Sequence, residues 1–387
     1  APGRTAYAGA NRPGPHTAGT ARRGEVVTSK RSQIIEPFLA VEIFQRAQEL
    51  ERQGQDIIHL EFGEPDFDTP PAIREAAEKA LKDGRTRYAH SLGLLPLREA
   101  IAEHYRARYG VTVSPEQVLV TAGTSPAMLL LFSTLLDPGD EVLVTDPRYA
   151  VYPNVIRYPG GECVHAPTWE TDGFQCRPAE FASRLSARTK AVLINSPANP
   201  TGAVMTAESL RETAGLGPWV VSDEIYHGLT YEGEEHTILE FTDRAFVLNG
   251  FSKAYAMTGW RLGYVIAPKE FMRALGIAHG NFFISTNEFV QWAALAGLPP
   301  FAPLEIASPQ DFVARQKRNS WISALIIVGF ILFFILVGLS VDYVYLYSYS
   351  PGGAPLPIAT LSALGFSMFM TLTGFYYGAD WVLASVG

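Results

Sequence analysis

The chain has 387 residues, and its 39 acidic side chains outnumber the 31 basic ones to give a formal net charge of −8. This length allows more than one domain and a large buried core. Because no basic stripe runs through the body of the sequence, its charge argues against nucleic acid as a partner and favours small-molecule chemistry. The two cysteines have no metal-ligand spacing and no further pairs, which predicts no metal site and a reducing compartment.

The first 28 residues differ from the rest in composition. Residues 1–28 are rich in Ala, Gly, Pro, Thr and Arg, have no acidic residue before Glu25 and contain no apolar run. Transit peptides are also rich in Arg and poor in acids, but this segment has no amphipathic period and no initiating Met. Since such a segment buries too little apolar surface to offset the entropy of ordering, we expect a disordered tail.

Residues 29–298 alternate short β-branched runs with helical patterns. The runs are nearly continuous in apolar residues, as buried strands of a mostly parallel sheet must be. Expected strands are 118–121, 141–145, 191–195, 219–223, 246–249 and 263–267, and the clearest helical patterns are 70–84, 95–110 and 126–136. This alternation predicts an α/β fold with a doubly wound, mostly parallel sheet.

In such sheets, ligands bind at the carboxyl ends of the strands, so the residues after each strand are the candidates for a site. Four strands are followed by polar or small residues that could act together on one ligand. They are the Gly123 loop after 118–121, the SPANPTG loop with Asn199 after 191–195, Asp223 with Tyr226 after 219–223, and Lys253 with Arg261 after 246–249. Each has an ordinary explanation by itself, as a capped turn, a rigid loop, a helix cap or a solvated lysine. Their occurrence at successive strand ends predicts one shared site.

The chemistry that these residues share is that of pyridoxal phosphate. Lys253 would hold the cofactor aldehyde as a Schiff base, since a lysine amine becomes nucleophilic where burial or a nearby cation lowers its pKa. Asp223 would pair with the pyridine nitrogen and keep it protonated. Asn199 and Tyr226 can both reach the ring hydroxyl oxygen. The other expected cofactor-binding residues are Gly123, Thr124, Ser125, Ser252 and Arg261, of which Thr124, Ser125 and Arg261 would hold the phosphate at a helix N-terminus.

The motifs that contain these residues closely resemble those of the class I/II aminotransferases, which are fold type I pyridoxal phosphate enzymes. FGEPDFDTP, TRYAHSLGLLPLREA, TAGTSPAM, DPRYAVYPN, NSPANPTG, VSDEIYHG and GFSKAYAMTGWRLG stand in the family's order and spacing. The resemblance runs from about residue 31 to about residue 298. It implies that Tyr149 stacks on the cofactor ring, that Gly63 lies near the substrate carboxylate, and that Tyr88 reaches the phosphate of the neighbouring subunit in a homodimer.

The activity implied by the resemblance is amino-group transfer between an L-amino acid and a 2-oxo acid. In it, Lys253, Asp223 and Tyr226 would be the catalytic residues, and the freed lysine would carry a proton between the substrate α-carbon and C4′ of the cofactor. A lyase on the same fold is an open alternative, because the cofactor-binding residues do not choose between transamination and elimination.

Three features depart from the family. Gly250 stands where members often have a hydroxyl residue that binds the phosphate, a difference worth about 0.5 to 1.5 kcal/mol. The helix before 219–223 looks about one turn short. After Leu298 a member would continue with the second half of its small domain, including an arginine that binds the substrate carboxylate, and we expect that part to be missing here. An inactive or membrane-anchored fragment, or a fusion artefact, is therefore the non-enzymatic alternative.

The last part of the chain has the composition of a membrane segment. Between Trp321 and Gly387 there is no Lys, Arg or His, and the only formal charges are Asp342 and Asp380. The uncharged run 321–341 is long enough, at about 1.5 Å per residue, to cross a hydrocarbon core of about 30 Å. A second apolar segment, 358–377, follows a Pro/Gly turn. Buried helices of a soluble protein are the alternative.

We therefore interpret 299–320 as a linker and 321–387 as a transmembrane hairpin. Basic residues precede its first span and none lies between the spans, so both ends should face the cytoplasm, with the catalytic domain on that side. The hairpin resembles, more weakly, the N-terminal membrane portion of M48-type zinc metallopeptidases. No HExxH motif occurs in the chain, so peptidase chemistry is not encoded.

Overall fold

The computed structural model describes residues 28–298 and, further along the chain, 321, 325, 328–329, 331–344 and 358–366. The chain divides into two compact units, Ala1–Leu304 and Glu305–Gly387. Nearly all of the predicted disordered tail, 1–28, and all of the predicted linker, 299–320, lie outside the described residues.

Within residues 28–298, seven strands form one sheet in the order β1-β7-β6-β5-β4-β2-β3. β7 runs antiparallel to β1 and β6, and the other neighbouring pairs are parallel. The strands are β1 (Val118–Thr121), β2 (Glu141–Asp146), β3 (Glu162–Pro167), β4 (Thr189–Asn195), β5 (Trp219–Asp223), β6 (Ala245–Gly250) and β7 (Gly263–Ile266). The mostly parallel α/β fold expected from the sequence is confirmed. The apolar runs miss only β3, because Glu162 and His165 interrupt its pattern at the edge of the sheet.

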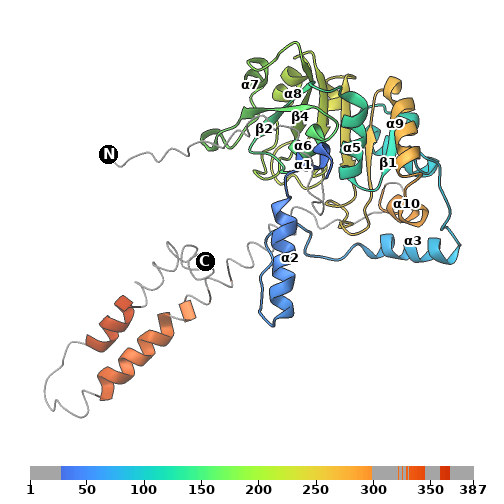
Figure 1. The fold of residues 1–387 in the computed structure, drawn as a ribbon. Helices are drawn as coiled ribbons and strands as arrows, with labels where there is room; N and C mark the ends of the chain where they lie inside the picture. The colour runs from blue at the N-terminus through green and yellow to red at the C-terminus, as the bar shows by residue number, and fades with distance from the viewer. Residues whose placement is uncertain are drawn as a thin grey trace, which may run out of the picture. The chain divides into compact units, whose positions relative to one another are not determined.

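Helices surround this sheet (Figure 1). The α-helices of the first unit are α1 (Lys30–Gln33), α2 (Leu39–Arg52), α3 (Pro71–Lys82), α4 (Leu95–Tyr109), α5 (Thr124–Leu135), α6 (Tyr152–Arg157), α7 (Pro178–Ala182), α8 (Ala207–Ala214), α9 (Lys269–Phe282) and α10 (Glu288–Leu295), and the 3₁₀ helices are η1 (Pro115–Gln117), η2 (Glu170–Asp172) and η3 (Ile238–Glu240). The three helical patterns expected at 70–84, 95–110 and 126–136 correspond to α3, α4 and α5.

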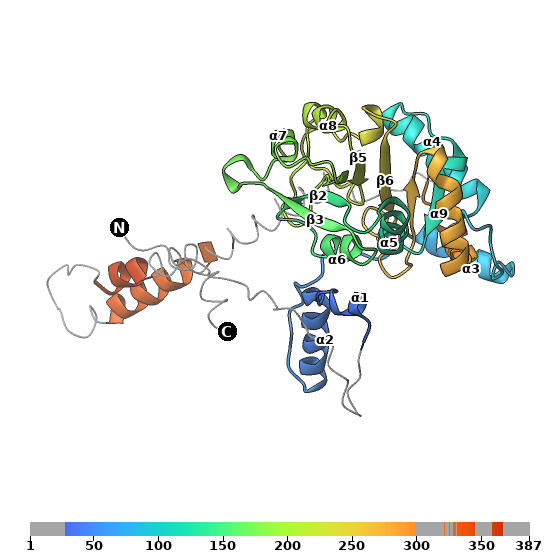
Figure 2. The same ribbon diagram turned by 45° about the horizontal axis from the view of Figure 1, so that its top comes forward.

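The core has two layers, one on each face of the sheet. Side chains alternate along the strands, so Val192 and Ile194 of β4 pack in one layer and Leu193 in the other. Figure 2 shows α4, α7 and α8 along one side of the sheet and α5, α6 and α9 along the other. Because both faces are covered, the strands must be apolar throughout, and this explains why their sequences read as continuous runs.

Local sequence explains where several helices begin and end. α4 ends at Gly110, whose φ of 70° is the left-handed conformation that a glycine adopts easily. α5 begins at Thr124, directly after Gly123, so the sequence-based start at Pro126 is two residues late. The short helix α8 begins after Thr206, whose side chain accepts a hydrogen bond from the Ser209 N–H.

In the second unit, residues 331–344 and 358–366 are helical. The carboxylate of Asp342 accepts hydrogen bonds from the N–H groups of Ala359 (2.9 Å) and Thr360 (2.8 Å), so it caps the start of the later helix. Among the residues described, no helix combines the length and the apolar character needed to cross a membrane. The predicted transmembrane hairpin is thus not supported, and its residues 322–324, 326–327, 330, 345–357 and 367–387 lie outside the described part.

Candidate active site

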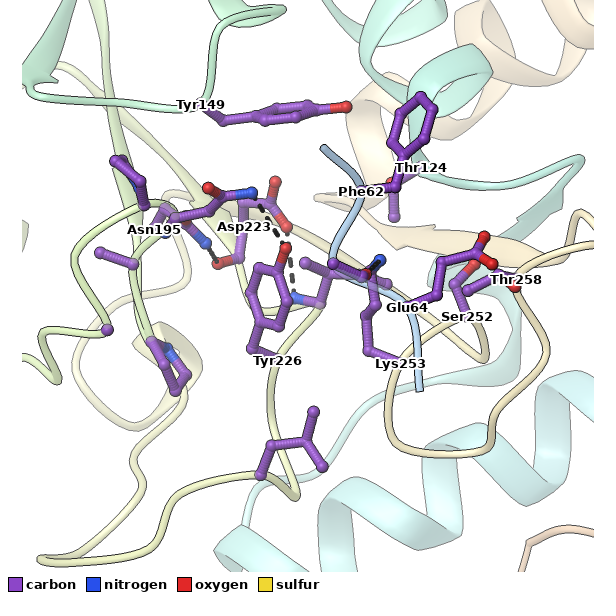
Figure 3. Close-up of a pocket in the computed structure, with 18 of the residues that line it drawn as sticks. Phe62, Glu64, Thr124, Tyr149, Asn195, Asp223, Tyr226, Ser252, Lys253 and Thr258 are labelled. Atoms are coloured by element: carbon purple, nitrogen blue, oxygen red, sulfur yellow. Dashed lines mark hydrogen bonds between the residues drawn. The ribbon is translucent and has the colours of Figure 1, made fainter. Parts of the chain in front are cut away.

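A cleft of about 1270 Å³ opens where the carboxyl ends of β4 and β5 meet the segment that follows β6. Its lining contains every residue predicted for the site except Gly123 and Tyr88. Figure 3 shows Asp223, Tyr226 and Lys253 around a common space, with the ring of Tyr149 on another side of it. The fold has therefore brought together residues that lie far apart in the sequence, such as Gly63 and Lys253, which are 190 positions apart and in contact.

Lys253 lies three residues beyond the end of β6 and is half-buried. Its Nζ donates a hydrogen bond to the backbone oxygen of Gly63 at 2.6 Å. Burial lowers the pKa of this amine, the charge of Glu64 raises it, and the charge of Arg261 lowers it further. The result is a lysine in the cleft with a larger neutral fraction than a solvated lysine has, which is the form that attacks a carbonyl.

Asp223 is the last residue of β5, and its side chain is buried. Oδ2 accepts a hydrogen bond from the Tyr152 hydroxyl at 2.8 Å, and Oδ1 accepts one from the N–H of Ile225 at 3.2 Å. Burial raises the pKa of Asp223 to about 6, although both hydrogen bonds act to lower it. No Lys, Arg or His in the described part of the chain forms an ion pair with this carboxylate, so it is ready to pair with a cation that enters the cleft.

Asn199 and Tyr226 lie side by side in the cleft. The amide of Asn199 donates to the Tyr226 hydroxyl at 3.0 Å. Asn195 holds this arrangement, because its Oδ1 accepts from the Asn199 N–H at 2.7 Å while its Nδ2 donates to the Asp223 backbone oxygen at 2.8 Å. Sequence reasoning missed Asn195, yet the signal was present: like Asp223, it is a polar residue at the last position of an apolar strand.

The start of α5 forms one end of the cleft. Gly123 has a φ of 96°, and a Cβ there would lie 2.7 Å from Nη2 of Arg261, so the guanidinium lies directly against the backbone before the helix. Thr124 and Ser125 begin the helix and line the cleft. Because the first N–H groups of a helix have no partner within it, this end of the cleft offers amides, hydroxyls and a cation to an anion.

An aromatic wall that the sequence did not reveal closes another side. Phe38 makes edge contacts with the rings of Tyr149 (5.8 Å between centroids) and Phe62 (6.2 Å). Phe38 precedes α2, and Phe62 lies next to Gly63. Both come from the part of the chain before the sheet, so no strand-end rule could have found them. Tyr88, by contrast, is 81% exposed and does not line this cleft.

Comparison with known proteins assigns the family. Residues 55–307 match the family described as aminotransferase class I and II. The chain is 42% identical over 275 residues to an aspartate/prephenate aminotransferase of Thermus thermophilus, covering 70% of this chain and 71% of the relative. The chain belongs to the class I and II aminotransferases.

Other relatives agree with this assignment. A (5-formylfuran-3-yl)methyl phosphate transaminase of Methanocaldococcus jannaschii is 41% identical over 293 residues, which cover 75% of this chain and 77% of the relative. The solved structure of the Thermus thermophilus aspartate aminotransferase with maleate superposes with a TM-score of 0.70 at 38% identity, covering 82% of this chain and 81% of that one. The chain is thus an aminotransferase, and pyridoxal phosphate is the cofactor of its family.

The residues of the cleft fit this cofactor. Asp223, a buried carboxylate with no ion pair to a described residue, suits a protonated pyridine nitrogen. The backbone at Gly123, where a side chain would collide with Arg261, suits a closely bound phosphate. Lys253 supplies the amine. These three features lie in or beside one cleft, as an elongated ligand with a cationic end, an aldehyde and a phosphate requires.

The structure also gives the reason for one departure from the family. A Cβ at Gly250 would lie 2.8 Å from the Cα of Gly263 and 2.9 Å from the backbone oxygen of Leu262. The two antiparallel strands β6 and β7 approach too closely here to admit a side chain without a backbone shift. A hydroxyl at this position would therefore need a different spacing of the two strands.

Proposed function

We propose that the chain transfers an amino group from an L-amino acid to a 2-oxo acid, with Lys253 as the residue that binds pyridoxal phosphate. The observation that carries the proposal is the placement in one cleft of Lys253 and the buried carboxylate of Asp223, which has no ion pair to a described residue. Aspartate is the first donor to test, because several relatives are named for it.

Pyridoxal phosphate, when bound, supplies an aldehyde that condenses with amines and a ring that accepts the electron pair left when the substrate α-carbon loses its proton. Asp223 would hold the proton on the pyridine nitrogen, and a cation beside it would lower the pKa of Asp223 from about 6 and keep it ionised. Asn199 and Tyr226 would bind the ring hydroxyl oxygen. Tyr149 would cover the ring.

Lys253 would transfer the α-proton of the substrate. Burial lowers the pKa of its Nζ. When not bound to the cofactor, this amine would act as the base that takes the α-proton of the substrate and holds it at Nζ. The phosphate would be fixed by Thr124, Ser125, Ser252 and Arg261 together with the backbone at Gly123, and Gly63 would lie near the substrate carboxylate.

We infer that two copies of the chain associate. Tyr88, Ile58 and Leu60 are each more than 80% exposed in the single chain, and large exposed apolar side chains favour a partner surface. In a homodimer, Tyr88 would reach the phosphate in the neighbouring subunit. The molar mass from light scattering after size-exclusion chromatography tests the dimer. A lower affinity for the cofactor in Tyr88→Ala would support the contact.

The central experiment is chemical trapping. The protein is incubated with pyridoxal phosphate, reduced with borohydride and digested, and the modified peptide is identified by mass spectrometry. We expect the label on Lys253 and a visible absorbance band before reduction. Lys253→Ala should lose both, whereas Lys190→Ala, at the amino end of β4, should keep both. A borohydride-reducible adduct that persists intact in Lys253→Ala would disprove the assignment.

Product analysis then separates the two reactions that the cofactor supports. With aspartate and a 2-oxo acid, a transaminase yields a new amino acid and no free ammonia, and a lyase releases ammonia or carbon dioxide without consuming the 2-oxo acid. Formation of the new amino acid at the rate of aspartate loss is the expected result.

A further inference from the structure

The turn that carries Asp223 and Tyr226 has a second face. Within Ser222–His227, these two residues line the cleft, whereas Glu224 and His227 do not. Glu224 is 1% exposed and His227 is 7% exposed, so both are buried behind the cleft wall. Neither of them has a role in the chemistry proposed above, yet buried ionisable groups are costly unless their hydrogen bonds are satisfied.

Glu224 is the centre of a hydrogen-bond network. Three donors converge on its Oε1: the hydroxyls of Ser222 (2.9 Å) and Thr237 (3.0 Å) and the N–H of Ile238 (3.0 Å). Its Oε2 accepts from the hydroxyl of Tyr105 in α4 at 3.4 Å. The carboxyl group therefore ties the turn to the start of η3 and to α4.

His227 joins this network, because its Nδ1 lies 3.5 Å from Oε2 of Glu224, and it extends the network in two directions. Its Nδ1 lies 2.7 Å from the hydroxyl of Tyr109, which donates to Glu235 at 2.9 Å. The ring also has a hydrogen bond with the backbone of Ser196, the residue after β4 in the loop that carries Asn199. His227 thus connects the turn after β5 with the loop after β4, and these two segments supply the residues expected at the cofactor ring.

The far end of the network returns to the cleft. Oε2 of Glu235 accepts from the N–H of Gly228 (2.7 Å) and the hydroxyl of Thr230 (3.0 Å), and its Oε1 forms an ion pair with Arg108 at 2.8 Å. The loop that these bonds close contributes residues 229–232 to the lining of the cleft. The rim of the cleft and the turn at its base are therefore held by one set of contacts.

The network is uncharged at its centre. Burial raises the pKa of Glu224 to about 8 and lowers the pKa of His227 to about 4, so near neutral pH both side chains are mainly neutral. Arg108 and Glu235, the charged groups that face them from α4 and from the rim loop, pair with one another. Any effect of the network on Asp223 must then come from position and not from an added charge.

We propose that Glu224 and His227 are positioning residues of the active site, which hold the turn 223–226 and the Asn199 loop so that Asp223, Tyr226 and Asn199 meet the cofactor ring. This inference rests on the proposed function. Satisfied buried polar networks make a structure rigid and specific, which is the property that a cofactor site needs.

The test uses the absorbance of the full chain with bound pyridoxal phosphate. The visible band that Lys253 forms with the cofactor is titrated with pH. A well-placed Asp223 keeps positive charge on the ring nitrogen, and a well-placed Tyr226 stabilises negative charge on the ring oxygen. Both effects favour release of the proton from the nitrogen that joins Lys253 to the cofactor. Loss of position in Glu224→Ala or His227→Ala should therefore raise the midpoint of the band, by about one pH unit.

Three further variants separate position from charge and from folding. Glu224→Gln keeps an acceptor for the three donors and should restore the midpoint of the unmodified chain. Tyr109→Phe removes one hydroxyl of the network and should give a smaller upward shift. Glu141→Ala removes another buried glutamate, at the amino end of β2 away from the cleft; it should lower the melting temperature and leave the midpoint unchanged.

Two results would overturn the positioning role, and a third would overturn the proposed function. An unshifted midpoint in both Glu224→Ala and His227→Ala overturns the inference while the proposed function stands. A shift in Glu224→Gln as large as that in Glu224→Ala also overturns it, because the effect would then come from the ionised carboxylate. If the unmodified chain forms no band that borohydride removes, the proposed function fails and the inference fails with it.

Discussion

Replacement of Glu224 by Gln should make the fold more stable relative to the unmodified protein as the pH rises. Burial raises the pKa of Glu224 from 4.5 to about 8. At pH 7 the unfolded chain has released this proton and the folded chain has kept it. The folded state is then destabilised by about 3 kcal/mol, from about 2.5 pH units at about 1.36 kcal/mol each.

The direction of this pH dependence follows from the raised pKa of Glu224 in the folded state. Because the folded-state pKa lies above the unfolded one, the stability that the protonated side chain contributes is complete below about pH 4.5 and is lost as the pH rises towards about 8. Gln does not titrate, and its amide offers an acceptor to Ser222, Thr237 and Ile238 and a donor to the other side. The difference in unfolding free energy, Gln minus Glu, should therefore increase by about 1.4 kcal/mol per pH unit.

The assay is urea unfolding of both cofactor-free proteins, followed by tryptophan fluorescence at several pH values between about 5 and 8. This range lies above the pKa of His227, which burial lowers to about 4, so the titration of that ring in the unfolded chain affects both proteins equally. A difference in free energy that is constant across the range would refute the reasoning. It would mean that Glu224 is already ionised in the folded protein at neutral pH, as in an ion pair with His227.

Three more substitutions test other parts of the cleft. Gly250→Ser should destabilise the fold by about 1 to 3 kcal/mol, because its Cβ would meet the backbone of β7, and a thermal melt with an unchanged midpoint would contradict this. Gly123→Ala should weaken pyridoxal phosphate binding about tenfold or more, since the φ of 96° strains an alanine and its Cβ collides with Arg261. A spectroscopic titration measures the affinity, and equal affinities in the two proteins would count against a phosphate site at the start of α5. Tyr152→Phe removes the hydroxyl whose hydrogen bond lowers the pKa of Asp223, so Asp223 should be protonated, and cofactor affinity should fall, at a higher pH than in the unmodified protein. Affinity that falls at the same pH in both proteins would argue that this hydrogen bond is unimportant.

The polar network shows how far sequence reasoning could reach into the site. Asp223 and Lys253 were found because the first ends a buried strand and the second lies three residues beyond one, and the carboxyl ends of parallel strands share one edge. Glu224 and His227 occupy the same turn, but their partners come from α4 and from beyond residue 234. No local sequence pattern predicts such partners, because hydrogen bonds between residues far apart in the chain produce no periodicity in the sequence.

The C-terminal segment was interpreted from its composition. Its hydropathy alone favoured two membrane spans, and a composition with only two charges over 321–387 admits few other readings. In the described part of that segment, Asp342 caps the helix that includes Ala359 and Thr360, and no helix there is long and apolar enough to span a membrane, so the two spans lack support.

By itself, the sequence determined six of the seven strands of the described sheet, the order of the motifs and most of the polar residues that meet where β4, β5 and β6 end. Those features are local: an apolar run makes a buried strand, and a glycine or proline places the turn that ends it. Tertiary structure alone decided that Asn195 bridges Asp223 and Asn199, that Phe38 closes the aromatic wall, and that Gly250 leaves no room for a hydroxyl. These depend on distances between strands and segments far apart in the chain, which only the packed sheet defines.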